Sequence, residues 1–171
     1  MRLKSYYKGG DRMLSIFKKR KAIELKSPVK GRAIEIKDVP DEVFASGMLG
    51  NGIAIDPVEG IVYSPCDCEI VNMFPTKHAI GVKTNEGLEI LIHIGIDTVE
   101  MKGEGFNSFV NIGDKVKAGD KLISFDLELV KSRAKSPITP MVITNMDFVE
   151  SIEQYYGDCD ASKTVLKAFL K

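Results

Sequence analysis

The chain has 171 residues, of which 44% are hydrophobic and 28% charged, and its formal net charge is zero. This length suits one domain whose core is large enough to fold without disulfides or a structural metal. The chain contains no apolar run of the roughly 20 residues that span a bilayer, no secretory signal, and only three cysteines, too few for a disulfide framework, so we expect a cytoplasmic protein.

The charge is distributed unevenly along the chain. Residues 1–30 contain ten Lys and Arg against two acidic residues, whereas the remainder contains 14 basic and 22 acidic residues. We expect residues 1–21 to form a flexible basic tail and residues 22–171 to form the domain. An acidic domain fits a basic protein partner better than a nucleic acid, so no nucleic-acid partner is expected.

The tail contains three apolar residues followed by four consecutive basic ones, Lys18 to Lys21. Such a segment could form a short amphipathic helix that contacts a membrane surface, which would place the protein peripherally at the inner face of the membrane. A tail that only keeps the domain soluble is the alternative, because chain termini are commonly unstructured.

From residue 22 onward, short β-rich runs alternate with turn signals. The runs are 32–36, 52–55, 60–63, 69–74, 78–83, 88–94 and 121–126. Short strands at this spacing predict an all-β domain, mainly an antiparallel β-sandwich or barrel-sandwich. Helical patterns occur at 127–135 and 162–169, so we expect short helical segments there. The sequence has no Gly-rich phosphate loop, which argues against ATP binding by such a loop.

His78 and His93 are the two histidines of the chain, and a turn signal lies between them. Asn85-Glu86-Gly87, with strand-like sequence on both sides, predicts a β-hairpin. If Lys83 faces Leu88 across the loop, His78 lies directly opposite His93, with Cβ atoms about 4.5–5.5 Å apart. A register that differs by one residue would break this pairing.

The alternation of residue types predicts which face of the hairpin is buried. The core side should hold the isoleucines of one parity, Ile90, Ile92, Ile94 and Ile96. The other side should present Glu89, Leu91, His93, Gly95 and Asp97, joined across the hairpin by Thr76, His78, Ile80 and Val82. Two histidines in an apolar surface with carboxylates nearby fit a docking surface around a reactive group.

Three roles for the histidine pair remain open from the spacing alone. The rings can be ordinary sheet residues with structural hydrogen bonds. They can bind zinc, for which imidazole is a common ligand, although only a carboxylate such as Asp97 offers a third ligand. They can also carry a phosphoryl group, because an unperturbed imidazole is mostly deprotonated, and hence nucleophilic, near pH 7.

The sequence around the histidines resembles the signature of glucose-type IIA domains of the phosphoenolpyruvate-dependent sugar phosphotransferase system. The matching segments are 76–82 (TKHAIGV) and 87–106 (GLEILIHIGIDTVEMKGEGF), and motifs at 28–31, 38–41, 43–45, 49–57 and 139–146 follow the family's order. The resemblance extends over residues 23–169. It implies a β-sandwich of the duplicated hybrid motif type and a phosphocarrier function in sugar uptake.

The resemblance also implies roles for individual residues. His93 corresponds to the residue that accepts the phosphoryl group on Nε2, and His78 to the imidazole that stabilises this group. Thr76 corresponds to the residue that orients His78, and Gly95 to the residue whose carbonyl orients His93. The carrier protein HPr would donate the group and a cysteine of a sugar-specific IIB domain would receive it, so the chain would be a phosphotransferase component. No cofactor is implied.

By position, the family's apolar docking surface corresponds to Phe44, Met48, Leu49, Phe74, Leu91 and Val99, and its partner-facing carboxylates to Asp41 and Asp97. The isolated protein is expected to hold no metal, although His78 and His93 could bind zinc in a complex whose partner adds a carboxylate. Cys66 and Cys68 are expected to be free thiols. The alternative function is a regulatory module of the same fold that binds other proteins according to its phosphorylation state.

Overall fold

The computed structural model describes residues 20–171, which form fourteen strands, two α-helices and three 3-10 turns. The strands are β1 (Ala22–Lys26), β2 (Gly31–Glu35), β3 (Asn51–Pro57), β4 (Ile61–Tyr63), β5 (Cys68–Met73), β6 (Ala79–Lys83), β7 (Glu89–His93), β8 (Phe106–Ser108), β9 (Lys115–Val116), β10 (Lys121–Phe125), β11 (Thr139–Ile143), β12 (Val149–Gln154), β13 (Gly157–Cys159) and β14 (Thr164–Leu170). The helices are α1 (Glu42–Ala45) and α2 (Leu127–Arg133), and the 3-10 turns are η1 (Ile36–Asp38), η2 (Thr98–Met101) and η3 (Met146–Phe148).

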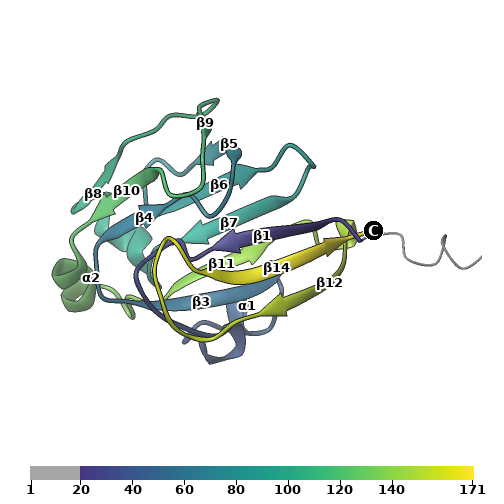
Figure 1. Ribbon diagram of the computed structural model, residues 1–171. Helices are drawn as coiled ribbons and strands as arrows, with labels where there is room; N and C mark the ends of the chain where they lie inside the picture. Colours follow the sequence, from purple (N-terminus) through teal and green to yellow (C-terminus); the bar gives the residue numbers. More distant parts are fainter. Residues whose placement is uncertain (1–19) are drawn as a thin grey trace, which may run out of the picture.

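The strands form three antiparallel sheets, which confirms the predicted all-β class (Figure 1). The largest sheet has eight strands in the order β13-β2-β3-β11-β7-β6-β5-β9, and the two smaller sheets have the orders β1-β14-β12 and β4-β10-β8. Strand β7 pairs with both β11 and β6. His93, the last residue of β7, therefore belongs to a strand that is hydrogen-bonded on both sides.

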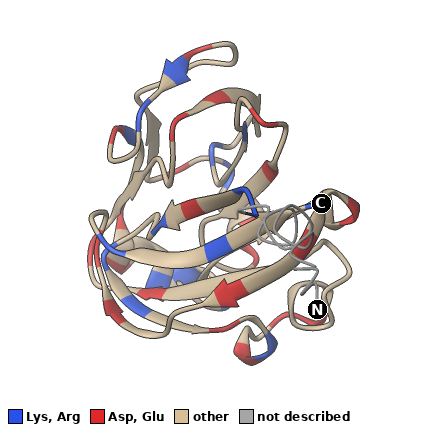
Figure 2. Ribbon diagram, turned by 45° about the vertical axis from the view of Figure 1, so that its right-hand side comes forward, with Lys and Arg blue, Asp and Glu red and all other residues tan. Residues whose placement is uncertain are grey.

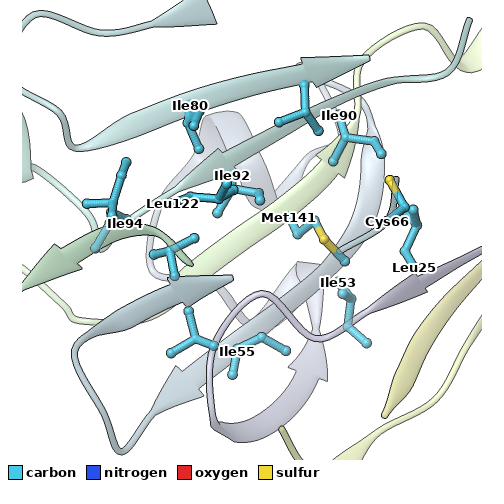
Figure 3. Packing of buried hydrophobic residues seen from close by; sticks show 14 of the residues in the cluster. Leu25, Ile53, Ile55, Cys66, Ile80, Ile90, Ile92, Ile94, Leu122 and Met141 are labelled. Carbon is cyan, nitrogen blue, oxygen red and sulfur yellow. The ribbon is translucent and has the colours of Figure 1, made fainter. Parts of the chain in front are cut away.

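Alternation along β7 sends its residues to two different faces. Ile90 and Ile92 are buried in the main core, whereas Leu91 and His93 point the other way and are partly exposed. Figure 3 shows the main core, in which side chains from different strands of the large sheet, including Ile53 and Met141, pack together. Each fully buried branched side chain contributes roughly 1.5–3 kcal/mol of hydrophobic stabilisation, so this packing holds β7 firmly in place.

A second, smaller apolar cluster lies on the opposite face of the large sheet. It consists of Val39, Phe44, Ala54, Ile96 and Val142. Leu91 packs against it from β7, and α1 supplies its aromatic member. His93 shares the face of Leu91, so the histidine lies beside this second cluster rather than in the main core.

The helix predicted at residues 162–169 is wrong, because this segment is the strand β14. It is the central strand of its sheet, bonded to β1 on one side and to β12 on the other. Val165, Leu166 and Ala168 are completely buried there. Backbone hydrogen bonds to two neighbours and burial of the apolar residues outweigh the helical preference of leucine, lysine and alanine.

The other predicted elements are found close to their expected positions. Each predicted strand begins and ends within about two residues of an observed strand. Helix α2 forms inside the predicted segment 127–135 and is capped by the preceding Asp126, whose carboxylate accepts a hydrogen bond from the backbone N–H of Leu129 at 3.0 Å. This contact satisfies one of the free N–H groups at the start of the helix.

None of the helices within residues 20–171 is long and apolar enough to span a membrane. Lys and Arg, and Asp and Glu, occur on strands and loops throughout the coloured ribbon (Figure 2). The predicted tail at residues 1–21 and its membrane-contacting helix lie almost entirely outside the described residues, which begin at Arg20. The division into tail and domain therefore stays a prediction.

Candidate functional site

The position of the His93 ring is determined by a turn that follows β7. The Nδ1 atom of His93 lies 2.7 Å from the carbonyl oxygen of Gly95. Because a carbonyl oxygen can only accept, Nδ1 carries the proton and donates it to this bond. The lone pair of the neutral ring is then on Nε2. The turn thus leaves Nε2 as the nucleophilic atom of the imidazole.

Gly95 is the residue that makes this turn possible. Its φ of 68° lies in the left-handed region, which glycine adopts readily. A Cβ atom at this position would lie 2.7 Å from Thr98 Cγ2 and 2.8 Å from the carbonyl oxygen of Ser136. Any larger residue would push the carbonyl that holds the His93 ring out of place.

Three residues that the sequence did not indicate support the same turn. The Thr98 hydroxyl donates to the Ile94 carbonyl at 2.6 Å. The backbone N–H of Ile96 donates to the Ser136 carbonyl at 2.8 Å, and the Gly95 N–H donates to the Thr139 hydroxyl at 3.4 Å. Ser136 and Thr139 lie some forty residues further along the chain, and no local motif connects them with His93.

His78 lies directly before β6 and is buried, with 5% of its surface exposed. Its Nδ1 atom forms a short hydrogen bond of 2.5 Å with the hydroxyl of Thr76. Lys77, between these two residues, has a left-handed φ of 58°. The ring centroids of His78 and His93 are 5.0 Å apart with an interplanar angle of 78°, so the structure brings the two predicted histidines together.

The predicted hairpin register is wrong by one residue. His93 faces Ala79, and Lys83 faces Glu89. The loop closes on Thr84 and Leu88, because the backbone and the hydroxyl of Thr84 both bond with the backbone of Leu88. Three residues remain in the loop, with Gly87 at a positive φ of 98°, an arrangement common in three-residue hairpins.

The shifted register changes the predicted faces. Ile80 and Val82 face Ile92 and Ile90 and are completely buried in the main core, so their predicted place beside His93 is wrong. His78 still meets His93 because it lies before the strand pairing begins. If β6 extended to His78, alternation would place this side chain on the core face. The bend at residues 77 and 78 instead turns the ring toward the face that holds His93.

Two phenylalanines enclose the imidazole pair. The ring of Phe44 lies 5.2 Å from that of His93 with an interplanar angle of 60°, and the ring of Phe74 lies 5.4 Å from that of His78 at 64°. Aromatic rings at these separations and tilts make favourable contacts. Each phenylalanine therefore covers one side of an imidazole with apolar surface.

Burial keeps both histidines neutral. It lowers the pKa of His78 to about 4, and the neighbouring His93 adds to this shift. Burial also lowers the pKa of His93, while the Gly95 hydrogen bond and the carboxylates of Asp41 and Asp97 oppose that shift. Both rings are therefore uncharged near pH 7, the state in which Nε2 of His93 has a free lone pair.

These lowered pKa values predict a loss of stability in weak acid. The unfolded chain takes up protons below about pH 6.5, whereas folded His78 stays neutral down to about 4. The stabilisation is complete above pH 6.5 and is lost as the pH falls toward 4, at a cost on the order of 2 kcal/mol. Urea unfolding at about pH 7.5 and about pH 4.5 should show a larger loss in wild type than in His78→Gln. Equal losses would contradict the burial argument.

The two predicted carboxylates, Asp41 and Asp97, lie near His93. Asp41 caps a helix, and Asp97 has an unusual backbone conformation. Asp41 caps the start of α1, where its carboxylate accepts a hydrogen bond from the backbone N–H of Phe44 at 3.2 Å. Asp97 is exposed and has a left-handed φ of 60°. Because both carboxylates raise the pKa of His93, their charge reaches the ring. A cationic side chain of a partner could face them.

The predicted docking residues differ in exposure. Met48, Leu49 and Val99 are 75%, 38% and 50% exposed, as a docking surface requires. Phe44 is buried and packs within the second cluster, while Phe74 and Leu91 are partly buried. We call the exposed residues Val43, Met48, Leu49 and Val99 the apolar rim. Val43 is 40% exposed and was missed, because the sequence does not show which side of the short α1 faces solvent.

Within residues 20–171, no three His, Cys, Asp or Glu side chains are grouped so that they could hold a metal ion. His78 and His93 would supply two ligands of the four that a tetrahedral zinc ion requires. A zinc site built on these two rings would therefore need ligands from another molecule.

The sequence and the structure match proteins of one family. Residues 23–149 match the family described as phosphoenolpyruvate-dependent sugar phosphotransferase system, EIIA 1. The chain is 56% identical over 147 residues to a PTS system glucose-specific EIIA component of Bacillus cereus, a match that covers 85% of this chain and 89% of that protein. A protein with the same description from Halalkalibacterium halodurans is 55% identical over 128 residues, covering 75% and 74% of the two chains.

A solved structure shows the same fold. Glucose permease IIA from Mycoplasma capricolum aligns with a TM-score of 0.80 and 38% sequence identity, over 86% of this chain and 96% of that one. The matched family region, residues 23–149, contains both histidines, the Gly95 turn and the apolar rim.

Proposed function

The chain belongs to the EIIA 1 family of the phosphoenolpyruvate-dependent sugar phosphotransferase system and is a phosphocarrier of that system, and we propose that its carrier atom is Nε2 of His93. The observation that supports this choice is the hydrogen bond from His93 Nδ1 to the Gly95 carbonyl, 2.7 Å long. It fixes the tautomer before the donor arrives. The nucleophile therefore needs neither a general base nor a rotation of the ring.

The proposed reaction is an in-line exchange between two nitrogen atoms. The Nε2 lone pair of His93 attacks the phosphorus of a phosphohistidine on the donor. A new N–P bond forms on His93, and the N–P bond of the donor breaks with its electron pair returning to the donor ring. In the second step a cysteine thiolate of the acceptor attacks the same phosphorus, an S–P bond forms, and the N–P bond of His93 breaks with its electron pair returning to Nε2. Positioning and charge stabilisation supply most of the rate of such transfers.

His78 is the group that stabilises the transferred charge in this proposal. With the Thr76 hydroxyl donating to its Nδ1, the ring carries its proton on Nε2 and can donate it to a phosphoryl oxygen. The low pKa of His78 supports this role, because a neutral ring has one fixed N–H donor and keeps its orientation. Hydrogen bonds aimed at developing charge in a dry site contribute strongly to rate.

The partners are a phosphocarrier protein and a sugar permease, for which we propose HPr as donor and a IIB domain as acceptor. The apolar rim supplies a water-excluding contact around the histidines, and Asp41 and Asp97 supply negative charge at its edge. This pattern fits a partner with an apolar centre and a basic side chain. The interface should be small, because each complex must separate after transfer.

We place the reaction in the cytoplasm. The three cysteines are free thiols, a state that a reducing compartment maintains. The basic tail could bring the carrier to the inner face of the membrane, where its permease lies. That contact depends on residues outside the described part of the chain and is a proposal only.

The experiment that tests the proposal follows labelled phosphate from phosphoenolpyruvate through purified general phosphotransferase proteins. Wild type should take up one acid-labile phosphoryl group per chain, and ³¹P spectra should assign it to the Nε2 isomer of phosphohistidine. The charged protein should then lose its label to a purified IIB domain. Label that is acid-stable, or bound through Nδ1, would overturn the assignment. A chain that accepts phosphate but passes none to any IIB domain would support the regulatory function.

A further inference from the structure

Two cysteines lie two residues apart where the chain enters β5. Cys66 and Cys68 are both buried, with 7% of each residue exposed, and both are free thiols. The Cα atoms of residues two apart in an extended strand are about 6.6 Å apart, and the bend at residues 65–67 shortens this separation. Disulfide-bonded cysteines have Cα atoms roughly 4.4–6.8 Å apart, so the backbone allows a bond between the two sulfur atoms.

The two sulfur atoms have different surroundings. The Ser64 hydroxyl lies 3.3 Å from Cys68 Sγ and 2.7 Å from the Cys66 carbonyl oxygen. The neighbouring Cys66 side chain lowers the pKa of the Cys68 thiol, and Ser64 adds to this effect against the opposing effect of burial. The neighbouring Cys68 side chain, together with burial, raises the pKa of the Cys66 thiol. The Cys68 thiol is therefore the more acidic of the two.

A surface hollow distinguishes the two cysteines, although both are equally exposed and both belong to the main core. Cys68 lines a hollow of about 210 Å³ that also contains Lys115 and Lys117, whereas Cys66, seen in the core in Figure 3, is not part of its lining. Asp67 and Glu69 line the same hollow, so the charges balance and the hollow does not select an anion. A small uncharged molecule that enters the hollow therefore meets Cys68 first.

We propose that Cys66 and Cys68 form an oxidisable dithiol in which Cys68 reacts with a small hydroperoxide and Cys66 closes the disulfide. Cys68 first releases its proton to solvent, its thiolate then attacks an oxygen of hydrogen peroxide, the S–O bond forms and the O–O bond breaks, and the departing hydroxide takes up the released proton to become water. Cys66 sulfur then attacks the sulfenic sulfur, the S–S bond forms and the S–O bond breaks. The proton of Cys66 leaves with that oxygen as water. In total, the two thiols lose two electrons and two protons, and the peroxide becomes two waters.

Cys159 provides a matched internal comparison. It is 8% exposed and lines a larger surface hollow, so its access resembles that of Cys68. Its sulfur contacts the Ser27 hydroxyl at 3.3 Å and the Gly31 carbonyl at 3.5 Å, and neither group is a thiol. Similar burial without a neighbouring sulfur should leave Cys159 unreactive, because reactivity follows thiolate character.

The test treats the reduced full-length protein with a small excess of hydrogen peroxide and maps its tryptic peptides. Cys66 and Cys68 lie on one peptide, residues 38–77, and Cys159 on another, residues 136–163. We expect the first peptide to lose about 2 Da and to resist alkylation, while Cys159 is still alkylated. If the first peptide keeps both thiols, or if Cys159 is oxidised as fast, the proposal is wrong. This readout needs no variant and does not depend on His93.

Two variants assign the order of events. In Cys66→Ser the sulfenic acid on Cys68 should persist and be trapped by dimedone, because no thiol remains to resolve it. In Cys68→Ser oxidation at Cys66 should be slower by about tenfold or more, because that thiol is not part of the hollow's lining and its pKa is raised. Trapping at Cys66 as fast as at Cys68 would overturn the assigned roles. The Cys159→Ser variant should behave as wild type.

Discussion

His93→Ala should lose phosphoryl acceptance by a factor of at least about a thousand, because the nucleophile itself is removed. No other side chain of the site can take its place. Nε2 of His78 points its proton, not a lone pair, at the phosphoryl group in the proposed tautomer, and the carboxylates of Asp41 and Asp97 are poor acceptors beside a negatively charged donor. The measurement is acid-labile label per chain after incubation with phosphoenolpyruvate and the general phosphotransferase proteins.

The substitution should leave the fold intact, because His93 lies at the end of β7 and is only partly buried. Thermal unfolding and circular dichroism close to those of wild type would establish this. Gly95→Ala offers a second variant, in which the ring remains but the carbonyl that fixes its tautomer is displaced by the clash with Thr98 and Ser136. Full labelling of a folded His93→Ala would refute His93 as the carrier residue.

His78→Ala should separate acceptance from delivery. With excess donor, the variant should still reach full labelling, since a slower step goes to completion when the donor drives it. Delivery to a IIB domain should be slower by roughly a hundredfold, the usual effect of removing one donor to a charged transition state. The measurement is the single-turnover rate of label transfer from purified phosphorylated protein.

A conservative variant tests whether the effect arises from the lost donor. His78→Gln keeps an N–H group that can reach the phosphoryl oxygens, so it should recover part of the rate that His78→Ala loses. Thr76→Val should give an intermediate defect, because the ring remains but its Nδ1 loses its hydrogen bond. If His78→Ala delivers its phosphoryl group at the wild-type rate, the second imidazole has only a structural role.

Much of the fold followed from local signals, and the errors have identifiable causes. Turn residues and period-two alternation placed the strands because both are properties of short segments. The segment 162–169 was misassigned because its helix-forming residues become a strand only between β12 and β1, and β1 lies at the other end of the domain sequence. Such long-range pairing has no local signature.

In the site, too, local motifs were predicted correctly and features that depend on tertiary contacts were not. His78 and His93 were recognised as a pair from their motifs, but the hairpin register was wrong because the loop closes on Thr84 and Leu88, which brings Lys83 opposite Glu89. The two rings still meet because the left-handed backbone of Lys77 turns His78 toward His93, and the alternation of residue types does not predict this turn. The supports at Ser136 and Thr139 could not be predicted, because their function depends on the tertiary position of β11 beside β7.

The pairing of the first strand with the last also has a consequence for how the chain folds. Leu25 in β1 faces Leu166 in β14, and the N–H of Leu170 donates to the carbonyl of Lys21. Contacts between residues so distant in sequence have a high loop-closure entropy and slow the folding of a domain. During synthesis, β1 leaves the ribosome first and must wait for β14 before its sheet can form. The domain therefore completes its fold only after nearly the whole chain has been translated.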